Sequence, residues 1–191
     1  MTKTLILIFV EGETDLEFYR ALVGHMHDKH GHLHCKVKYK NLKGSGNYKT
    51  EAYNYYKKQI IPYYRKYNHK IALCYDTDVF ERPGYIPVDW NRVEKALRQA
   101  GAKKILRIEA RHTIEDWFFY DREGIRNYLN LPRTLNMNKY QGLDDLKTLF
   151  RMSGKPYVKG MGCKDFIESL DLDLLLISIQ EEIKELLSLL R

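Results

Sequence analysis

Two acidic motifs in this chain follow directly after short apolar runs. They read Val10-Glu11-Gly12-Glu13-Thr14-Asp15 and Asp76-Thr77-Asp78. If both apolar runs are parallel strands of one sheet, the acids meet at one edge, because the loops that leave the carboxyl ends of such strands form the ligand crevice. Crowded carboxylates favour a divalent cation between them. The spacing therefore predicts a metal site that the two motifs share.

Three carboxylates form the centre of the predicted site. Glu11 stands where the first strand should end, beside the positive end of the following helix dipole. Asp76 and Asp78 are two residues apart, so they point the same way in extended backbone. Mg²⁺ usually takes only one or two protein carboxylates together with substrate phosphates, so these acids suffice to hold Mg²⁺ or Mn²⁺. Any one of them, taken alone, could instead cap a helix or form a turn.

An alternation of strands and helices is expected to position these acids. The sequence predicts strands over residues 5–10, 33–42, 71–75 and 105–108, and helices over residues 14–26, 49–67, 90–100 and 113–128. Thr14 and Asp15 are expected to cap the first helix, Pro62 to kink the second and Thr113 to cap the fourth. This alternation predicts an α/β fold, with a Rossmann-like parallel sheet of about four strands and helices on both faces.

The same pattern predicts one catalytic domain over residues 1–130 and a helical C-terminal extension over residues 131–191 that packs on the same domain. With 191 residues and 44% hydrophobic content, the chain can bury a sizeable core. The leucine-rich stretch at residues 172–190 is amphipathic. We expect it to join the core, and contact with a partner is the alternative.

The cysteines and the apolar N-terminal run indicate in which cellular compartment the protein is expected. Cys35, Cys74 and Cys163 are odd in number and show no paired spacing, which favours a reducing compartment over a disulfide framework. The apolar run before Glu11 is too short to cross a membrane and lacks a small-residue cleavage site. We therefore expect a soluble, cytoplasmic protein without a membrane partner.

Positive charge is concentrated in the middle of the chain. The net charge is +7, and the stretch from Lys36 to Lys70 holds ten Lys or Arg and eight tyrosines against one acid, Glu51. Cations neutralise phosphates and aromatic rings stack on unpaired bases, so this mixture predicts contact with nucleic acid. Candidate contacts are Lys43, Lys49, Lys57 and Lys58. The alternative is an ordinary solvated face, because the apolar side chains recur at helical spacing: Ala52, Tyr56, Ile60, Tyr63 and Tyr67.

Two further patterns are weaker. The segment Gly44-Ser45-Gly46-Asn47-Tyr48-Lys49-Thr50 lies between a strand and a helix as a nucleotide-binding loop would, but Tyr48 stands where that loop has glycine, so we do not expect ATP binding. Its amides and Lys49 could contact a nucleic-acid phosphate, or the segment could be a plain turn. Five histidines between His25 and His34 lie near Cys35, but their spacing fits no established zinc signature.

The acidic motifs resemble those of a known superfamily. The string Ile8-Phe9-Val10-Glu11-Gly12-Glu13-Thr14-Asp15 resembles the first motif of the TOPRIM superfamily, and Tyr75-Asp76-Thr77-Asp78 resembles its DxD motif. The resemblance covers residues 4 to 120 and implies a compact, Rossmann-like parallel sheet with Mg²⁺-dependent phosphodiester chemistry. Together with Ile114-Glu115-Asp116-Trp117, the pattern is most similar to small OLD-like nucleases, which often act beside an ABC-type ATPase in phage defence. We find no zinc ribbon, primase fold or strand-passing domain, so primase and topoisomerase activities are not expected.

The resemblance also assigns roles to individual acids. It matches Glu11 to the glutamate that contacts metal or acts as acid and base, and it matches Asp76 and Asp78 to the metal-binding pair. Asp15 would support the metal from behind these ligands. Glu115 could complete a second metal position, and capping the helix that begins there is an equally good explanation.

Basic residues are expected to complete the active site. Lys159 and Lys164 lie in a glycine-punctuated stretch where OLD-like nucleases tend to place a lysine that stabilises the transition state, although lysines are common in any surface loop. Arg107 and Arg111 should flank the crevice, where they could hold a phosphate or neutralise the acids.

Together these patterns predict a metal-dependent endonuclease that hydrolyses DNA or RNA. The expected catalytic residues are Glu11, Asp76, Asp78, Glu115, Lys159 and Lys164. The alternative is a non-catalytic subunit that binds nucleic acid or an ATPase partner. An ABC-type ATPase and a second copy of the chain are candidate partners, and the sequence does not choose between DNA and RNA.

Overall fold

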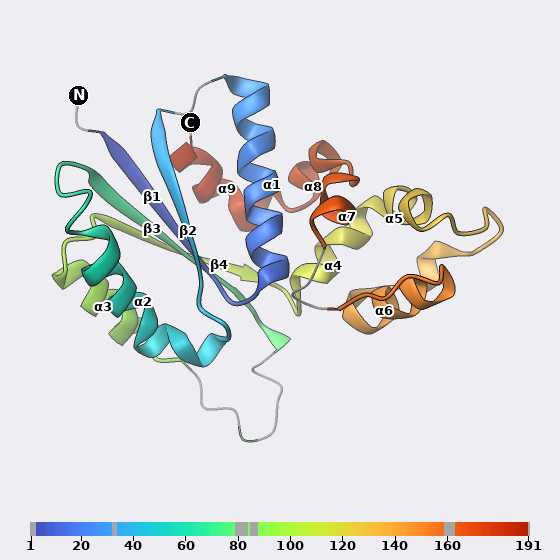
Figure 1. Ribbon diagram of the computed structural model, residues 1–191, viewed down its shortest axis with the longest axis horizontal. Helices are drawn as coiled ribbons and strands as arrows, with labels where there is room; N and C mark the ends of the chain where they lie inside the picture. The colour runs from blue at the N-terminus through green and yellow to red at the C-terminus, as the bar shows by residue number, and fades with distance from the viewer. Residues whose placement is uncertain (1–2, 32–33, 79–83, 85–87, 159–162, 191) are drawn as a thin grey trace.

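A four-stranded parallel sheet forms the centre of the protein. In a computed structural model, residues 3–31, 34–78, 84, 88–158 and 163–190 are described (Figure 1). The strands β1 (Thr4–Val10), β2 (Cys35–Asn41), β3 (Asn68–Asp76) and β4 (Lys104–Ala110) are all parallel, in the order β2-β1-β3-β4. This arrangement confirms the predicted α/β fold. Parallel strands require crossover connections, which here are the helices that cover the two faces.

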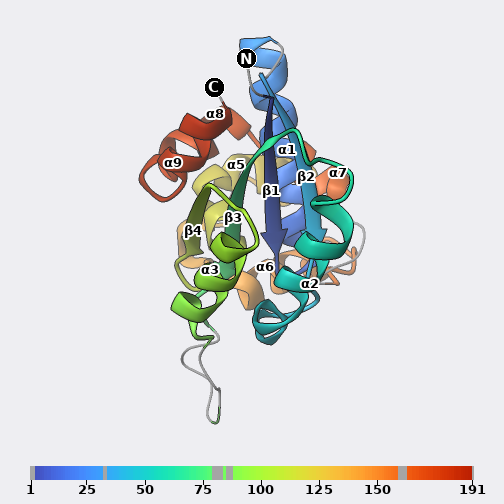
Figure 2. The ribbon, with the colours of Figure 1, turned by 90° about the vertical axis from the view of Figure 1, so that its left-hand side faces the viewer.

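Alternate residues of the central strand β1 supply two separate cores. Leu5, Leu7 and Phe9 face α2 (Glu51–Tyr55) and α3 (Trp90–Gln99), whereas the residues between them face α1 (Glu13–His30) and the C-terminal helices. Figure 2 shows these two helical layers on opposite sides of the sheet. Every residue from Leu5 to Val10 is fully buried, as expected for a strand covered on both faces.

The helix after β1 begins earlier than the sequence predicts. Gly12 is its N-cap, in extended backbone, and Glu13 is its first residue. Thr14 and Asp15 therefore lie inside the first turn, and the expectation that they cap α1 was wrong. The helix continues to His30, four residues beyond the predicted end.

The predicted helix over residues 49–67 is shorter and less regular. A 3₁₀ turn, η1 (Ser45–Lys49), precedes α2, and a π-helical turn, η2 (Tyr56–Ile60), follows it. The helical segment ends there instead of kinking at Pro62, because proline cannot donate the next helical hydrogen bond.

The predicted helix over residues 113–128 is divided into α4 (Ile114–Phe118), the 3₁₀ turn η4 (Phe119–Asp121) and α5 (Arg122–Leu129). Thr113 caps α4, as predicted, and the structure adds that it does so in a capping box with Asp116. The break follows from Asp121, whose carboxylate accepts from the Gly124 amide at 2.9 Å and so begins a new helix.

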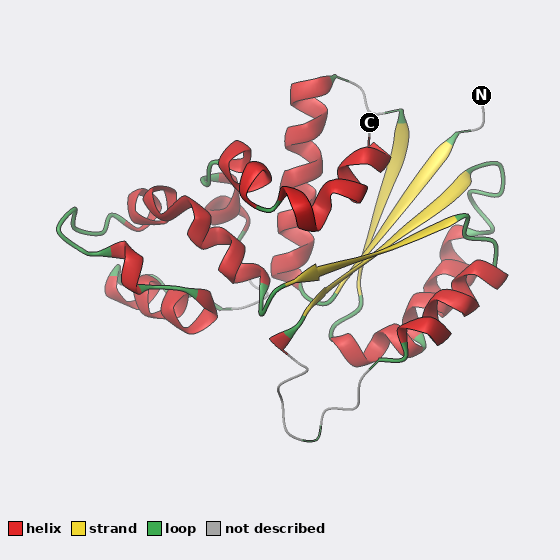
Figure 3. Cartoon of the chain, turned by 180° about the vertical axis from the view of Figure 1, so that it is seen from behind, coloured by secondary structure: helices red, strands yellow, loops and turns green. Residues whose placement is uncertain are grey.

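The C-terminal region is helical, as predicted, and belongs to the core. It contains η5 (Met137–Lys139), α6 (Gly142–Met152), α7 (Lys164–Glu168), α8 (Leu172–Ser178) and α9 (Gln180–Leu190). The side chains of Ile183 and Leu186 on α9 are fully buried in the cluster that includes one face of the sheet. From behind, α9 is seen beside the strands, while α5 and α6 lie farther out (Figure 3). Within the described residues, no helix combines the length and apolar content needed to cross a lipid bilayer.

Candidate active site

The acids of the two sequence motifs lie at the carboxyl ends of adjacent strands. Glu11 directly follows β1, and Asp76 is the last residue of β3, its neighbour in the sheet. The Ile114 amide at the start of α4 donates to Asp76 Oδ1 at 3.0 Å, which brings Glu115 to the same edge. We call the five carboxylates here the acidic edge: Glu11, Asp15, Asp76, Asp78 and Glu115.

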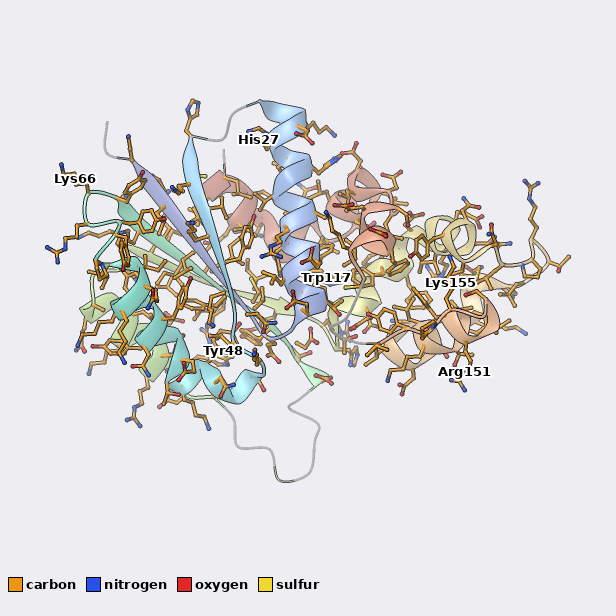
Figure 4. All side chains as sticks on the ribbon, viewed as in Figure 1. His27, Tyr48, Lys66, Trp117, Arg151 and Lys155 are labelled. Atoms are coloured by element: carbon orange, nitrogen blue, oxygen red, sulfur yellow. The ribbon has the colours of Figure 1, made fainter. Side chains whose placement is uncertain are left out.

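Tyr48 connects the two strands beneath this edge. Its hydroxyl donates to the main-chain oxygen of Phe9 at 3.1 Å and also hydrogen-bonds to that of Cys74. These carbonyls lie two residues before Glu11 and two residues before Asp76. Figure 4 shows Tyr48 near the strand ends, with Lys66 at the opposite end of the sheet.

Three acids of the acidic edge act on the hydroxyl of Tyr48. Burial raises the pKa of its hydroxyl well above the ordinary value, and nearby Cys74 and three carboxylates raise it further. These carboxylates belong to Glu11, Asp15 and Asp76, which come from three different segments. Each of these three acids therefore lies within electrostatic reach of the Tyr48 hydroxyl.

Most of the acidic edge is withdrawn from solvent. The exposed fraction is 2% for Asp15, 3% for Asp76 and 0% for Glu115, while Glu11 and Asp78 are half-buried. Burial of a carboxylate is costly unless donors or cations compensate for it. The Tyr157 hydroxyl supplies one donor, 3.1 Å from Glu115 Oε1, and proximity to this carboxylate adds to burial in raising the pKa of Tyr157.

Gly12 makes room for one of the buried acids. A Cβ atom built on Gly12 would lie 3.0 Å from Oδ2 of Asp15. The φ angle of Gly12 is −136°, which any residue adopts, so the need for glycine comes from space and not from backbone conformation. The carboxylate of Asp15 is therefore folded back against the turn that carries Glu11.

The segment after β3 is fixed to the segment after β4. The Thr77 amide donates to the Ala110 oxygen at 3.1 Å, and the Asp78 amide donates to the His112 oxygen at 2.9 Å. The His112 amide in turn donates to Thr77 Oγ1 at 2.8 Å. This pairing holds the backbone of Asp78 beside that of the exposed residue Arg111.

A cavity of about 480 Å³ lies next to this pairing. Its lining includes two cations, two acids and several aromatic rings: Arg111, Arg122, Asp116, Glu182, Trp117, Phe119 and Tyr120. Its volume is in the range of pockets that bind small molecules. The cavity reaches Arg111 and His112, and the main-chain oxygen of His112 accepts from the Asp78 amide.

The other predicted basic residues are distributed differently. Arg107 lies within β4, paired with Glu94 of α3 at 3.2 Å, so it does not join Arg111 at the strand ends. Lys164 begins α7, 3.6 Å from Glu168, and lines a separate cavity with residues of α1. Lys159 lies outside the described residues.

The basic middle segment combines buried rings with exposed cations. The predicted stripe is confirmed for Ala52, Tyr56 and Ile60, which are buried, but Tyr63 is 73% exposed because the helix has already ended there. The candidate contacts all lie on the surface: Lys43, Lys49, Lys57 and Lys58. Exposed lysines of this kind are compatible both with contact to nucleic acid and with an ordinary solvated face.

Two tyrosines of the site were missed in the sequence. Tyr48 was noticed only because it stands where a nucleotide-binding loop has glycine, and no local pattern marked it as buried. Tyr157 offered no local signal, because its partner Glu115 is 42 residues away. Glu115 does not cap α4, since Thr113 occupies that position.

The donor set of the acidic edge fits a hard divalent cation. Its members supply carboxylate oxygens, which Mg²⁺ and Mn²⁺ prefer, and Oε1 of Glu11 and Oε2 of Glu115 are fully buried atoms. Among the described residues, no three His, Cys, Asp or Glu side chains are grouped closely enough to hold a metal ion. The Mg²⁺ or Mn²⁺ site therefore stays a prediction. His25 does not support a zinc site, because its Nε2 atom is hydrogen-bonded to Oδ1 of Asp173 at 2.9 Å.

Comparison of the chain with models of protein families, with curated proteins and with solved structures found no match.

Proposed function

We propose that the protein is a metal-dependent nuclease that hydrolyses nucleic-acid phosphodiesters. The observation that carries the proposal is the position of Glu11 directly after β1 and of Asp76 at the end of β3, adjacent parallel strands that Tyr48 joins by hydrogen bonds. Ligands of such sheets bind at this edge. The motif order matches the TOPRIM resemblance, and a small OLD-like nuclease that acts with an ABC-type ATPase in phage defence is the form we propose.

In this proposal, each residue of the acidic edge and its neighbours has a separate role. Glu11, Asp76 and Asp78 would hold Mg²⁺ or Mn²⁺, which supplies Lewis-acid polarisation of a phosphoryl oxygen and lowers the pKa of a bound water. The Ile114 amide fixes the orientation of Asp76, and Tyr157 does the same for Glu115. Arg111 is exposed beside Asp78, where its guanidinium can attract a phosphate.

A second candidate is a non-catalytic subunit that binds nucleic acid or an ATPase partner. The internal hydrogen bonds of Asp76 and Glu115 favour it, because each uses a carboxylate oxygen within the fold. In this case the acids would serve to anchor α4 and the segment around Tyr157.

The two candidates differ in turnover. Purified protein would be incubated with Mg²⁺ or Mn²⁺ and with plasmid, single-stranded DNA or a tRNA pool. We expect cleavage that Glu11→Gln and Asp76→Asn each reduce by at least about 100-fold. The matched controls are Glu123→Gln and Asp144→Asn, whose side chains are 72% and 95% exposed, and these should cleave normally.

Equal cleavage by Glu11→Gln and the unaltered protein would exclude the proposed site. Absence of cleavage on every substrate, with and without an added ATPase, would favour the binding subunit. Manganese binding gives an independent readout by electron paramagnetic resonance, because bound and hydrated Mn²⁺ have different signals.

A further inference from the structure

Three lysines stand in a row on the edge strand of the sheet. Among the described residues, β2 is paired with β1 alone, and its residues Lys36, Lys38 and Lys40 are opposite Leu5, Leu7 and Phe9. Alternate residues of a strand share one face, so the three lysines lie on the face that also carries α2 and α3. We call Lys36, Lys38 and Lys40 the lysine row.

Tyrosine rings hold the row in place. Lys36 Nζ lies 5.2 Å and Lys38 Nζ 5.9 Å from the ring centroid of Tyr64, and Lys40 Nζ lies 5.2 Å from that of Tyr55. Cation–π attraction at these distances limits the rotamers of a flexible side chain. The ammonium groups are thus partly ordered before any ligand arrives, which lowers the entropic cost of binding.

The stretch of sequence that carries the row contains little negative charge. Glu51 is the only acid between Lys36 and Lys70. Lys57 adds another cation on the same side, 5.5 Å from the ring of Tyr53. A patch of this kind attracts a polyanion and releases counterions when it binds.

The geometry of the row suits one strand of nucleic acid. Alternate lysines on a strand stand about 7 Å apart, which is comparable with the separation of neighbouring phosphates along a nucleic-acid backbone. One end of the lysine row also lies close to the acidic edge. Lys40 is opposite Phe9, two residues before Glu11, and Asn41 donates to Glu13 Oε2 at 3.0 Å.

We propose that the lysine row binds the sugar–phosphate backbone of a nucleic-acid strand and directs that strand to the acidic edge. The part of this proposal that guides the strand to a reacting centre rests on the proposed function, whereas the binding of the strand by the lysine row does not. Lysines on an edge strand can instead serve to prevent pairing with another chain, and the test separates the two roles.

The test compares two triple variants with the same change of charge. One replaces the row (Lys36→Gln, Lys38→Gln, Lys40→Gln), and the control replaces exposed or half-buried lysines on η5, α6 and α9 (Lys139→Gln, Lys147→Gln, Lys184→Gln). Both carry Asp76→Asn, and binding to a labelled single-stranded oligonucleotide is followed by fluorescence anisotropy over a range of salt concentrations without divalent metal.

We expect the row variant to bind more weakly and to lose about 2 from the slope of log affinity against log salt, at about 0.7 per phosphate contact. The control should keep the slope of the parent. Equal slopes for the two triples would overturn the proposal. So would self-association of the row variant, measured by light scattering, when its slope is unchanged, since this result assigns the row to edge protection.

Failure of the proposed function would look different. If Glu11→Gln cleaves normally while the oligonucleotide affinity of the row variant loses its salt dependence, the active-site assignment is wrong and the binding role of the lysine row is supported. If cleavage depends on Glu11 but the row variant binds the oligonucleotide like the control, the binding role of the lysine row is rejected and the proposed nuclease function is supported.

Discussion

At the scale of single residues, Tyr48 links the basic segment to the acidic edge. Its hydroxyl bonds main-chain oxygens of two adjacent strands, and its ring contacts Trp90 with centroids 5.0 Å apart. The side chain is fully buried, so water cannot replace the hydroxyl when it is removed.

Tyr48→Phe should therefore lower the free energy of unfolding by about 1–3 kcal/mol, because buried carbonyl oxygens lose their donor. Urea denaturation measures the change. Tyr53→Phe, on the half-buried surface of α2, is the control and should have little effect. Equal effects of the two substitutions would mean that the hydroxyl of Tyr48 is not specially placed.

Gly12 and Gly24 offer a second comparison, at the start and in the middle of the same helix. Gly12→Ala places a methyl group against Oδ2 of Asp15 and should reduce metal-dependent cleavage. A Cβ on Gly24 meets nothing within 4 Å, so Gly24→Ala should stabilise the protein by about 0.5–1 kcal/mol through helix propensity. Cleavage assays and urea denaturation of both variants test this. Unchanged cleavage by Gly12→Ala would show that the position of Asp15 does not matter for activity.

At the scale of elements, α1 and α8 are joined by charge. Asp173 of α8 accepts from Lys29 and His25 of α1, and these hydrogen bonds, Lys29 first, lower the pKa of Asp173 below its ordinary value. A depressed folded pKa gives stability that is present above the unfolded pKa and is lost as the pH falls through the folded one.

Asp173→Asn should consequently lower Tm slightly at pH 7, and the difference should disappear as the pH falls below the ordinary Asp pKa of about 3.9. Thermal denaturation at several pH values measures this convergence. Asp144→Asn, whose partner Lys147 is on the same helix, should show a smaller difference at every pH. A Tm difference for Asp173→Asn that persists at low pH would point to packing and not to charge.

Elements were predictable from sequence where local signals agreed. The apolar run over residues 5–10 and the threonine at position 113 identified a buried strand and a helix start. The break between α4 and α5 was missed, because Asp121 competes as a cap within a sequence of helical periodicity. Contacts between distant segments, such as Tyr157 with Glu115, depend on tertiary packing that the local pattern does not encode. The positions of Glu11 and Asp76 at adjacent strand ends were predictable because parallel strands align their ends, whereas the supporting tyrosines were not.

At the scale of the whole molecule, one sheet supplies both cores. The two tryptophans report on opposite faces. Trp117 lies in the core with α1 and the C-terminal helices, and Trp90 stacks on Tyr75 with centroids 4.1 Å apart on the face of α2 and α3. Since neighbouring residues of β1 belong to different cores, neither core can be lost while the other keeps its strands.

This coupling predicts that damage in α9 is felt across the sheet. Leu186→Ala should cost about 2–5 kcal/mol, because its side chain is fully buried among the C-terminal helices. In a Trp117→Phe background, where Trp90 is the only tryptophan, the urea midpoint from fluorescence should fall as far as the midpoint from far-UV circular dichroism, with an unchanged m value. Leu174→Ala, at a side chain that is 39% exposed on α8, should move both midpoints much less. A fluorescence midpoint that stays in place while the dichroism midpoint falls would show that residues 131–191 unfold as a separate unit.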